Sequence, residues 1–295
     1  MTIRSFVISA ILLASSLTAW ADKAPKTAIL VDKKTNNLHV CEYVNGEFKI
    51  IKTFHATLGQ VKGDKEEEGD LKTPEGVYVF TRKAVPPALR PKYGIMSFHV
   101  SFPNTFDELA GRTGSNIKLH ATNEPDRLSK NYDSEGCVVV RNEEITEIAP
   151  YIRLGLTPIL IFSELTPDFM KPGQDPKIQK FFETWVSDWE NKNLDGYMSH
   201  YHTDFAEPHK GKTKDGYRAY KAALNARYAS IEVKPEDVHY FRHPKYTMIT
   251  FTQNYRSKLK SGAWGHVSRG TKILYVAEEA GEPKIIAESF SNLAW

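Results

Sequence analysis

The sequence of 295 residues predicts two domains of the α+β class, joined by a short linker. Residues 27–162 contain short alternating apolar runs separated by turn residues, which is typical of a β-rich domain. Residues 166–176 contain several prolines and a glycine, as interdomain connectors often do. Beyond this connector the apolar residues recur first at helical spacing and then in alternating runs, which predicts helices followed by an antiparallel sheet.

The first residues have the pattern of a secretory signal peptide. Arg4 supplies a positive charge, residues 6–17 are apolar but too few to span a bilayer, and Ala19-Trp20-Ala21 fits a cleavage site. We expect residues 1–21 to be removed, leaving an exported, periplasmic protein with no transmembrane segment. An uncleaved N-terminal anchor is the alternative. The expected domains are then residues 22–165 and 177–295, with residues 166–176 as the linker.

The charge of the chain is close to balanced. A formal net charge of +3 arises from 39 basic and 36 acidic residues. No large uniform field indicates nucleic acid as a partner. We expect a small or polymeric substrate of mixed charge.

The first domain should begin with a β-meander. Residues 28–31, 38–43 and 48–54 read as strands joined by tight turns at Asn36-Asn37 and Asn45-Gly46. Residues 59–76 interrupt this pattern with glycines and an acidic run, so composition alone predicts a solvated loop leading into a strand at residues 77–80.

The second domain should begin with an amphipathic helix. Residues 217–228 are also helical in pattern, and residues 246–255, 272–277 and 284–290 read as strands. The first helix is expected to end at residues 193–196. The apolar face of the first helix consists of Ile178, Phe181, Phe182, Trp185 and Trp189.

A cysteine and a histidine carry the chemistry in the first domain. Cys137 lies in the run Ser134-Glu135-Gly136-Cys137, and His120 ends a strand-like segment seventeen positions earlier. A thiol becomes a good nucleophile when a base takes its proton, and chain reversal can bring an imidazole beside it. The pair therefore predicts a cysteine acyl-transfer enzyme. The alternative is a disulfide between Cys137 and Cys41, although Cys41 reads as a buried packing thiol.

Residues 27–163 resemble the L,D-transpeptidase catalytic domain family called YkuD, in its YafK-like branch. The family signature is a histidine, a loop and then Ser-His-Gly-Cys. Further motifs stand in the family order: Gly63-Asp64-Lys65, Glu68-Gly69-Asp70, residues 73–78, Phe102-Pro103-Asn104, residues 136–139, Asn142, Tyr151-Ile152 and Thr157-Pro158-Ile159. The resemblance implies a β-rich YkuD-type fold and action on peptidoglycan stem peptides.

The resemblance also implies the roles of individual residues. Cys137 would be the nucleophile, His120 its base, and the backbone carbonyl of Ala121 the group that fixes the imidazole. The amides of Gly136 and Cys137 are candidate oxyanion donors. Ser134, Gly136 and Arg141 are candidate substrate-binding residues. No metal and no other cofactor is needed.

Three positions depart from the commoner family pattern: Glu135, Ala121 and Val139 stand where histidine, glycine and arginine or asparagine are usual. A cation two residues after the cysteine would help to hold a substrate carboxylate, so either Arg141 or Lys118 is a possible replacement. His39, His55 and His99 read as surface or packing histidines, because the motif does not select them.

Residues 177–295 resemble the NTF2-like fold, in which helices close over a curved antiparallel sheet to form a cone with a pocket. His200, His202 and His209 read as polar turn residues rather than metal ligands. The domain could support a homo-oligomer or a wall-enzyme partner. Its aromatic residues, expected mostly in the core, are Trp185, Trp189, Tyr197, Tyr201, Phe205 and Trp264.

A YkuD-like domain followed by an NTF2-like domain is similar to the L,D-carboxypeptidases that trim stem peptides in curved and helical bacteria. The leading hypothesis is therefore removal of the terminal D-alanine from tetrapeptides at diaminopimelate. One alternative is transpeptidation, which would form cross-links or attach or detach a protein at diaminopimelate. Another is a non-catalytic wall-binding scaffold.

Overall fold

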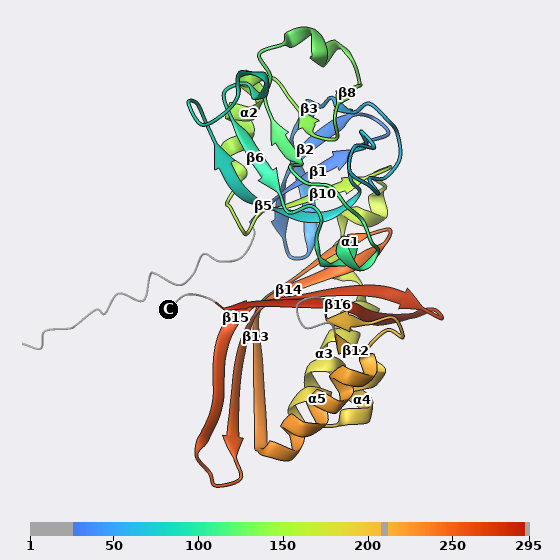
Figure 1. The fold of residues 1–295 in the computed structure, drawn as a ribbon, viewed down its shortest axis with the longest axis vertical. Coiled ribbons are helices and arrows are strands. Elements are labelled where there is room, and N and C mark those ends of the chain that lie inside the picture. The colour runs from blue at the N-terminus through green and yellow to red at the C-terminus, as the bar shows by residue number, and fades with distance from the viewer. Residues whose placement is uncertain (1–25, 208–211, 293–295) are drawn as a thin grey trace, which may run out of the picture.

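A computed structural model describes residues 26–207 and 212–292, which form two lobes packed one on the other (Figure 1). The N-terminal lobe is built on a sheet with the strand order β3-β2-β1-β10-β5-β6-β7-β9. Its strands are β1 (Thr27–Asp32), β2 (Asn37–Val44), β3 (Glu47–His55), β5 (Gly76–Ala84), β6 (Ser97–Val100), β7 (Lys118–His120), β9 (Val138–Val139) and β10 (Pro158–Phe162).

The predicted meander is present as β1, β2 and β3, which pair as antiparallel neighbours. Asn36, Asn45 and Gly46 adopt positive φ angles of 57°, 52° and 76° in the two connecting turns. Asparagine and glycine tolerate this left-handed region at little cost. Local turn chemistry therefore sets the order of these strands.

Shorter elements complete this lobe. Strand β4 (Leu58–Gly59) pairs in parallel with β8 (Tyr132–Ser134), and the two helices are α1 (Thr105–Leu109) and α2 (Asn142–Ile148). Thr57 and Val139 exchange two backbone hydrogen bonds of 2.9 Å each, so β4 follows directly from a bridge to β9. The 3₁₀ turns are η1 (Pro91–Tyr93), η2 (Pro125–Ser129) and η3 (Ala149–Tyr151).

The loop of residues 59–76 is only partly the solvated segment that its composition predicts. Its acidic run is exposed, but Lys65 is 3% exposed and binds Asp70 at 2.7 Å and the Glu67 carbonyl at 3.0 Å. Asp70 in turn accepts from the Glu66 amide at 2.8 Å. These internal contacts give the loop a defined shape because they satisfy a buried charge.

The C-terminal lobe is a curved sheet with the order β13-β14-β15-β16, and helices cover one of its faces (Figure 1). The three predicted strands lie within β14, β15 and β16, whereas β13 has no counterpart in the sequence prediction. The elements are α3 (Pro176–Glu190), α4 (Leu194–Ser199), β11 (Ala206–Glu207), β12 (Lys212–Thr213), α5 (Lys214–Arg227), β13 (Tyr228–His243), β14 (Tyr246–Leu259), β15 (Trp264–Glu279) and β16 (Glu282–Asn292).

Two local expectations in this lobe are wrong. The stop predicted at residues 193–196 is the beginning of α4, where the Asn193 side chain accepts from the Gly196 amide as an N-cap. Trp264, expected in the core, is 57% exposed near the end of the β14–β15 hairpin. There it lies under Arg256 and Lys258, at 5.6 and 5.1 Å from the ring centroid.

The connector between the lobes is structured. It contains η4 (Pro167–Met170) and η5 (Pro172–Gln174), and Gly173 donates to the Gly46 carbonyl at 2.9 Å. Phe169 and Met170 pack on an apolar cluster to which both lobes contribute. The principal aromatic members of this cluster are Tyr43, Phe48 and Phe162 from the first lobe and Phe241, Tyr246 and Tyr275 from the second. Such a shared core holds the two lobes together.

The described segments contain no helix that is both long and apolar enough to cross a membrane. The expected signal peptide at residues 1–21 lies outside the described residues.

Candidate active site

Strand pairing brings the cysteine and histidine segments side by side. β7 and β9 run in parallel, with Leu119 opposite Val138 and His120 opposite Val139. Cys137 immediately precedes β9, so it enters the same edge of the sheet at which His120 lies. The sixteen residues between them form an excursion that contains η2 and β8.

His120 is buried and held in one orientation. Its Nδ1 is 2.5 Å from the Ala121 carbonyl oxygen, and Tyr93 packs edge-on to the ring at 4.9 Å between centroids. Because a carbonyl can only accept, Nδ1 carries the proton and Nε2 of the neutral ring is left as a proton acceptor. Burial lowers the pKa of His120 to about 4 although the Ala121 carbonyl opposes this shift. The imidazole is therefore neutral at pH 7.

The Cys137 thiol is partly exposed, with the cations Lys118 and Lys92 and the anion Glu135 around it. Its Sγ donates to the Asn116 carbonyl at 3.8 Å rather than to His120. Burial raises the pKa of the thiol, while the Lys118 backbone amide and the Lys118 charge act in the opposite direction. The Lys118 ammonium binds the same Asn116 carbonyl at 2.9 Å. At rest the thiol is protonated beside a neutral base.

A tight turn positions the thiol. The Ser134 hydroxyl donates to the Cys137 carbonyl at 2.6 Å and accepts from the Gly136 amide at 3.1 Å. Gly136 has φ +118°, and a Cβ there would stand 2.7 Å from the Lys72 carbonyl oxygen. Only glycine fits this close approach in this conformation. Ser134, 1% exposed, therefore shapes the turn from inside it.

Of the two amides expected to bind the oxyanion, that of Gly136 donates to the Ser134 hydroxyl at 3.1 Å. It would have to exchange or share this partner to bind a substrate oxygen. We therefore expect the Cys137 amide to be the principal donor of the two.

Of the two cations considered, the structure places Lys118 at the thiol. Arg141 is exposed at the start of α2, where its amide donates to Glu144 at 2.7 Å. Lys118, by contrast, also lies over the Tyr93 ring at 4.9 Å. Burial lowers the pKa of Lys118, and the positive charges of Arg82, Lys92 and Arg90 lower it further. Arg82, Arg90, Lys92 and Tyr93 were not identified from the sequence, because they lie outside any motif and approach Lys118 and His120 only in the folded domain.

The second cysteine and two of the other histidines of the first lobe lie in other surroundings than the Cys137 thiol. Cys41 and Cys137 are both free thiols, so the alternative of a disulfide between them is not realised. Cys41 is fully buried, and burial raises its pKa to about 12. His39 contacts the Thr53 hydroxyl at 2.9 Å, and His99 contacts Arg82 at 2.8 Å.

His200 and His202 contact carboxylates separately. His200 binds Asp188 at 2.9 Å, and His202 lies 3.7 Å from Glu279. Within residues 26–207 and 212–292, no group of three or more His, Cys, Asp or Glu side chains is arranged to hold a metal ion. His209 lies outside the described residues.

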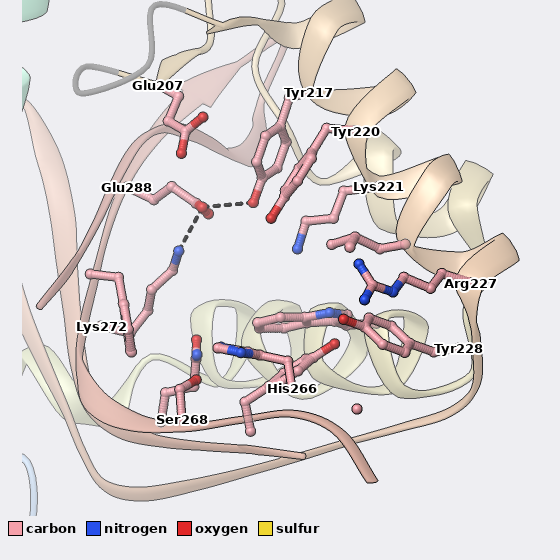
Figure 2. Close-up of a pocket in the computed structure, with 16 residues that line it drawn as sticks. Glu207, Tyr217, Tyr220, Lys221, Arg227, Tyr228, His266, Ser268, Lys272 and Glu288 are labelled. Carbon is pink, nitrogen blue, oxygen red and sulfur yellow. Dashed lines mark hydrogen bonds and ion pairs between the residues drawn. The ribbon is translucent and has the colours of Figure 1, made fainter. Parts of the chain in front are cut away.

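A second candidate site is a cavity of about 640 Å³ between α5 and the sheet of the C-terminal lobe (Figure 2). At one side Glu288 accepts from Tyr217 at 2.7 Å and pairs with Lys272 at 2.6 Å. Burial alone would raise the pKa of Glu288, but Lys272 and Lys221 outweigh it and hold that pKa below its ordinary value. Lys221 points into the cavity from α5, and its ammonium lies 4.1 Å from the Trp189 ring centroid. The cavity thus presents fixed charges of both signs beside aromatic rings.

Comparison with protein families assigns both lobes. Residues 26–161 match the L,D-transpeptidase catalytic domain, YkuD, and residues 177–289 match the Cds6 C-terminal NTF2-like domain. The solved structure of Bd1075 from Bdellovibrio bacteriovorus is 30% identical, with a TM-score of 0.78, over 93% of this chain and 95% of that one.

The chain is also similar to a cell-shape protein and to an L,D-transpeptidase. The helical cell shape determining protein Pgp2 from Campylobacter jejuni has the same fold, with 24% identity and a TM-score of 0.72 over 91% of this chain and 96% of that one. YafK of Escherichia coli (strain K12), whose name describes it as an L,D-transpeptidase, is 29% identical to this chain over 102 residues. That match is 35% of each protein, so the chain spans about a third of the length of the curated relatives it matches.

Proposed function

Because the chain belongs to the L,D-transpeptidase (YkuD) family, in the form that carries a C-terminal NTF2-like domain, we propose that it trims peptidoglycan stem tetrapeptides to tripeptides. The bond cleaved is that between diaminopimelate and the terminal D-alanine. The observation that carries this proposal is the buried neutral His120, locked by the Ala121 carbonyl, on the strand that pairs beside Cys137. A scaffold would need neither group.

The reaction follows from these positions. As the Cys137 sulfur bonds to the diaminopimelate carbonyl carbon, Nε2 of His120 takes the thiol proton. The Cys137 amide donates to the oxyanion that forms. Collapse of this intermediate breaks the carbon–nitrogen bond, and His120 returns the proton to the departing D-alanine amine. Water then attacks the thioester with His120 again as base, releasing the tripeptide carboxylate and restoring the thiol.

The basic cluster around Lys118 supports a substrate that ends in a carboxylate. Lys118 and Lys92 act on the thiol as positive charges against the negative charge of Glu135, and Arg90 and Arg82 act on the Lys118 ammonium in turn. A terminal D-alanine carboxylate would be attracted to this side of the site. In this proposal Lys118, and not Arg141, is the cation that holds the substrate carboxylate. Ser134 and Gly136 shape the turn that carries Cys137.

Hydrolysis is preferred to transpeptidation on one ground. Pgp2, which shares the two-lobe fold, is described as determining helical cell shape. Trimming of stem peptides is a chemistry by which wall shape can be set, and it requires only water as acceptor. Formation of cross-links, or attachment or release of a protein at diaminopimelate, stays the second candidate.

We further propose that the cavity of the C-terminal lobe binds the wall. Its carboxylate and ammonium groups suit the zwitterionic end of a peptide, and its rings suit aliphatic or sugar surfaces. A homo-oligomer or a partner wall enzyme would be an alternative use of this lobe. Action on peptidoglycan also agrees with the export to the periplasm expected for residues 1–21.

The test is muropeptide analysis by mass. The mature protein is incubated with disaccharide tetrapeptides and with purified sacculi, alongside a Cys137→Ala variant. Tripeptide and free D-alanine in equal amounts, absent with the variant, are the expected products. New dimers would instead identify transpeptidation, and identical profiles for the two proteins would contradict the catalytic proposal.

The pH dependence of kcat/KM should report His120. The base must be neutral, and burial lowers its pKa to about 4, so activity is expected to hold down to pH 5 and to fall as the pH drops through about 4. An ordinary histidine would lose activity near pH 6.5. Release of D-alanine is measured from pH 3.5 to 8, with circular dichroism to confirm that the protein remains folded. An acid limb between pH 6 and 7 would contradict the neutral, buried base.

A further inference from the structure

A hairpin of the C-terminal lobe reaches into the catalytic lobe. The turn between β13 and β14 carries Lys245, whose ammonium binds both the Asp64 carboxylate and the Glu75 carbonyl. On either side of it, His243 donates to the Ile161 carbonyl at 3.0 Å and Tyr246 accepts from the Val77 amide at 2.9 Å. The neighbours therefore fix the backbone from which Lys245 extends.

The groups that Lys245 binds lie in the loop of residues 59–76. Asp64 also pairs with Arg112 and accepts from the Glu75 amide at 2.7 Å. Burial would raise the pKa of Asp64, but Lys245 and Arg112 hold it below its ordinary value, so the carboxylate stays charged. From another side Lys33 donates to the Thr73 carbonyl at 2.7 Å. The loop is thus anchored to both lobes.

The same loop forms the support of the Cys137 turn. The Gln60 amide donates to the Ser134 carbonyl at 2.9 Å. The Lys72 carbonyl lies so close to Gly136 that a methyl group there would stand 2.7 Å from it. The Ser134 hydroxyl in turn accepts from the Gly136 amide and donates to the Cys137 carbonyl, and these bonds fix the position of Cys137. A shift of the loop must therefore move the nucleophile.

We propose that Lys245 is a positioning residue, through which the C-terminal lobe sets the geometry of the Cys137 thiol. The path runs from Lys245 to Asp64 and Glu75, through the loop, to Gly136. A single lysine at this place neutralises Asp64 together with Arg112 and satisfies the Glu75 carbonyl. The catalytic lobe on its own lacks this anchor, so we infer that full activity depends on the C-terminal lobe. This inference rests on the proposed function for its kinetic test.

The test compares Lys245→Met with Lys171→Met in the full chain. Methionine keeps the apolar stem of Lys245 but removes both contacts. We expect kcat to fall about 10- to 100-fold, because small displacements of a nucleophile have effects of this size, with a smaller change in KM. Lys171 pairs with Glu47 of the first lobe at 3.5 Å at an exposed position, and its variant should match the wild type. Lys245→Arg, which can still reach both acceptors, should restore most of kcat.

The rate of Cys137 alkylation by iodoacetamide gives a readout that needs no substrate. It should change in Lys245→Met and not in Lys171→Met, at a temperature well below unfolding. Failure of the proposed function would leave this difference intact, since alkylation does not depend on stem peptides. If Lys245→Met does not fold, Asp64→Asn replaces it and should show the same changes. Wild-type kcat and alkylation rate in the folded variant would overturn the proposal.

Discussion

Replacing Cys137 by alanine is expected to lower kcat/KM for tetrapeptide trimming at least about 10³-fold, because the thioester cannot form without the sulfur. His120 and the Cys137 amide would still be present, but they act on a nucleophile that is missing. The fold should be unaffected, since the side chain is partly exposed and its hydrogen bond to the Asn116 carbonyl is a long one of 3.8 Å. The measurement is D-alanine release together with the thermal midpoint of unfolding.

Cys41 provides the matched control for this variant. It is fully buried in β2, and burial raises its pKa to about 12. Cys41→Ala should keep the activity and lower the unfolding free energy by about 1 kcal/mol. A thiol reagent should modify Cys137 in the folded protein and Cys41 only after unfolding. Loss of activity in Cys41→Ala, with retention in Cys137→Ala, would reverse the assignment of the nucleophile.

Replacing Lys272 by methionine is expected to lower the unfolding free energy of the protein by about 3–5 kcal/mol at pH 7. Lys272 and Glu288 are 7% and 5% exposed, and the change would leave the Glu288 carboxylate in the cavity without its direct partner. The Tyr217 and Tyr201 hydroxyls, at 2.7 and 3.0 Å, would still donate to it but would not neutralise its charge. Denaturant unfolding of the two proteins measures the difference.

The pH dependence gives this prediction a definite sign. In the wild type the pKa of Glu288 is depressed, so its contribution to stability is present above the ordinary value of 4.5 and is lost as the pH falls through the lower, folded value. Without Lys272 the carboxyl should take up a proton more readily. The gap in stability between the two proteins should therefore narrow below about pH 4.5.

An exposed ion pair provides the control for Lys272. Lys34 and Glu164 are 61% and 53% exposed at a separation of 2.7 Å, so Lys34→Met should cost no more than about 1 kcal/mol. The double variant Lys272→Met, Glu288→Gln should recover part of the loss, because the buried charge that lacks its direct partner is gone. Equal effects of the Lys34 and Lys272 variants would show that the pair is not desolvated in solution.

Prediction from the sequence succeeded where short-range chemistry decides the structure. The β-meander follows from turns in which Asn36, Asn45 and Gly46 adopt positive φ, and each of these residue types tolerates that conformation. The helix α3 follows from an apolar face whose members are buried together. The two-lobe fold was also predicted, since the change of apolar period near the connector marks the boundary.

It failed where a pattern has more than one meaning. Asn193 and Gly196 are typical of a helix end, yet Asn193 is equally good as the N-cap that begins α4. Strand β13 was missed because its exposed and buried residues do not alternate regularly, and a register shift interrupts it between Glu236 and His239. Trp264 was expected in the core because its side chain is large and apolar, but its place on a protruding hairpin keeps it exposed.

Residue identity and order are enough to name the reacting groups: a thiol at Cys137, an imidazole at His120 and the family motifs around them. The protonation and surroundings of these groups, however, follow from the folded protein. The buried neutral ring of His120, Lys118 as the cation at the thiol, and the contact of Lys245 with Asp64 all depend on segments distant in the chain. Burial and charge are set by neighbours in space, and those neighbours exist only once the sheet and the two lobes have assembled.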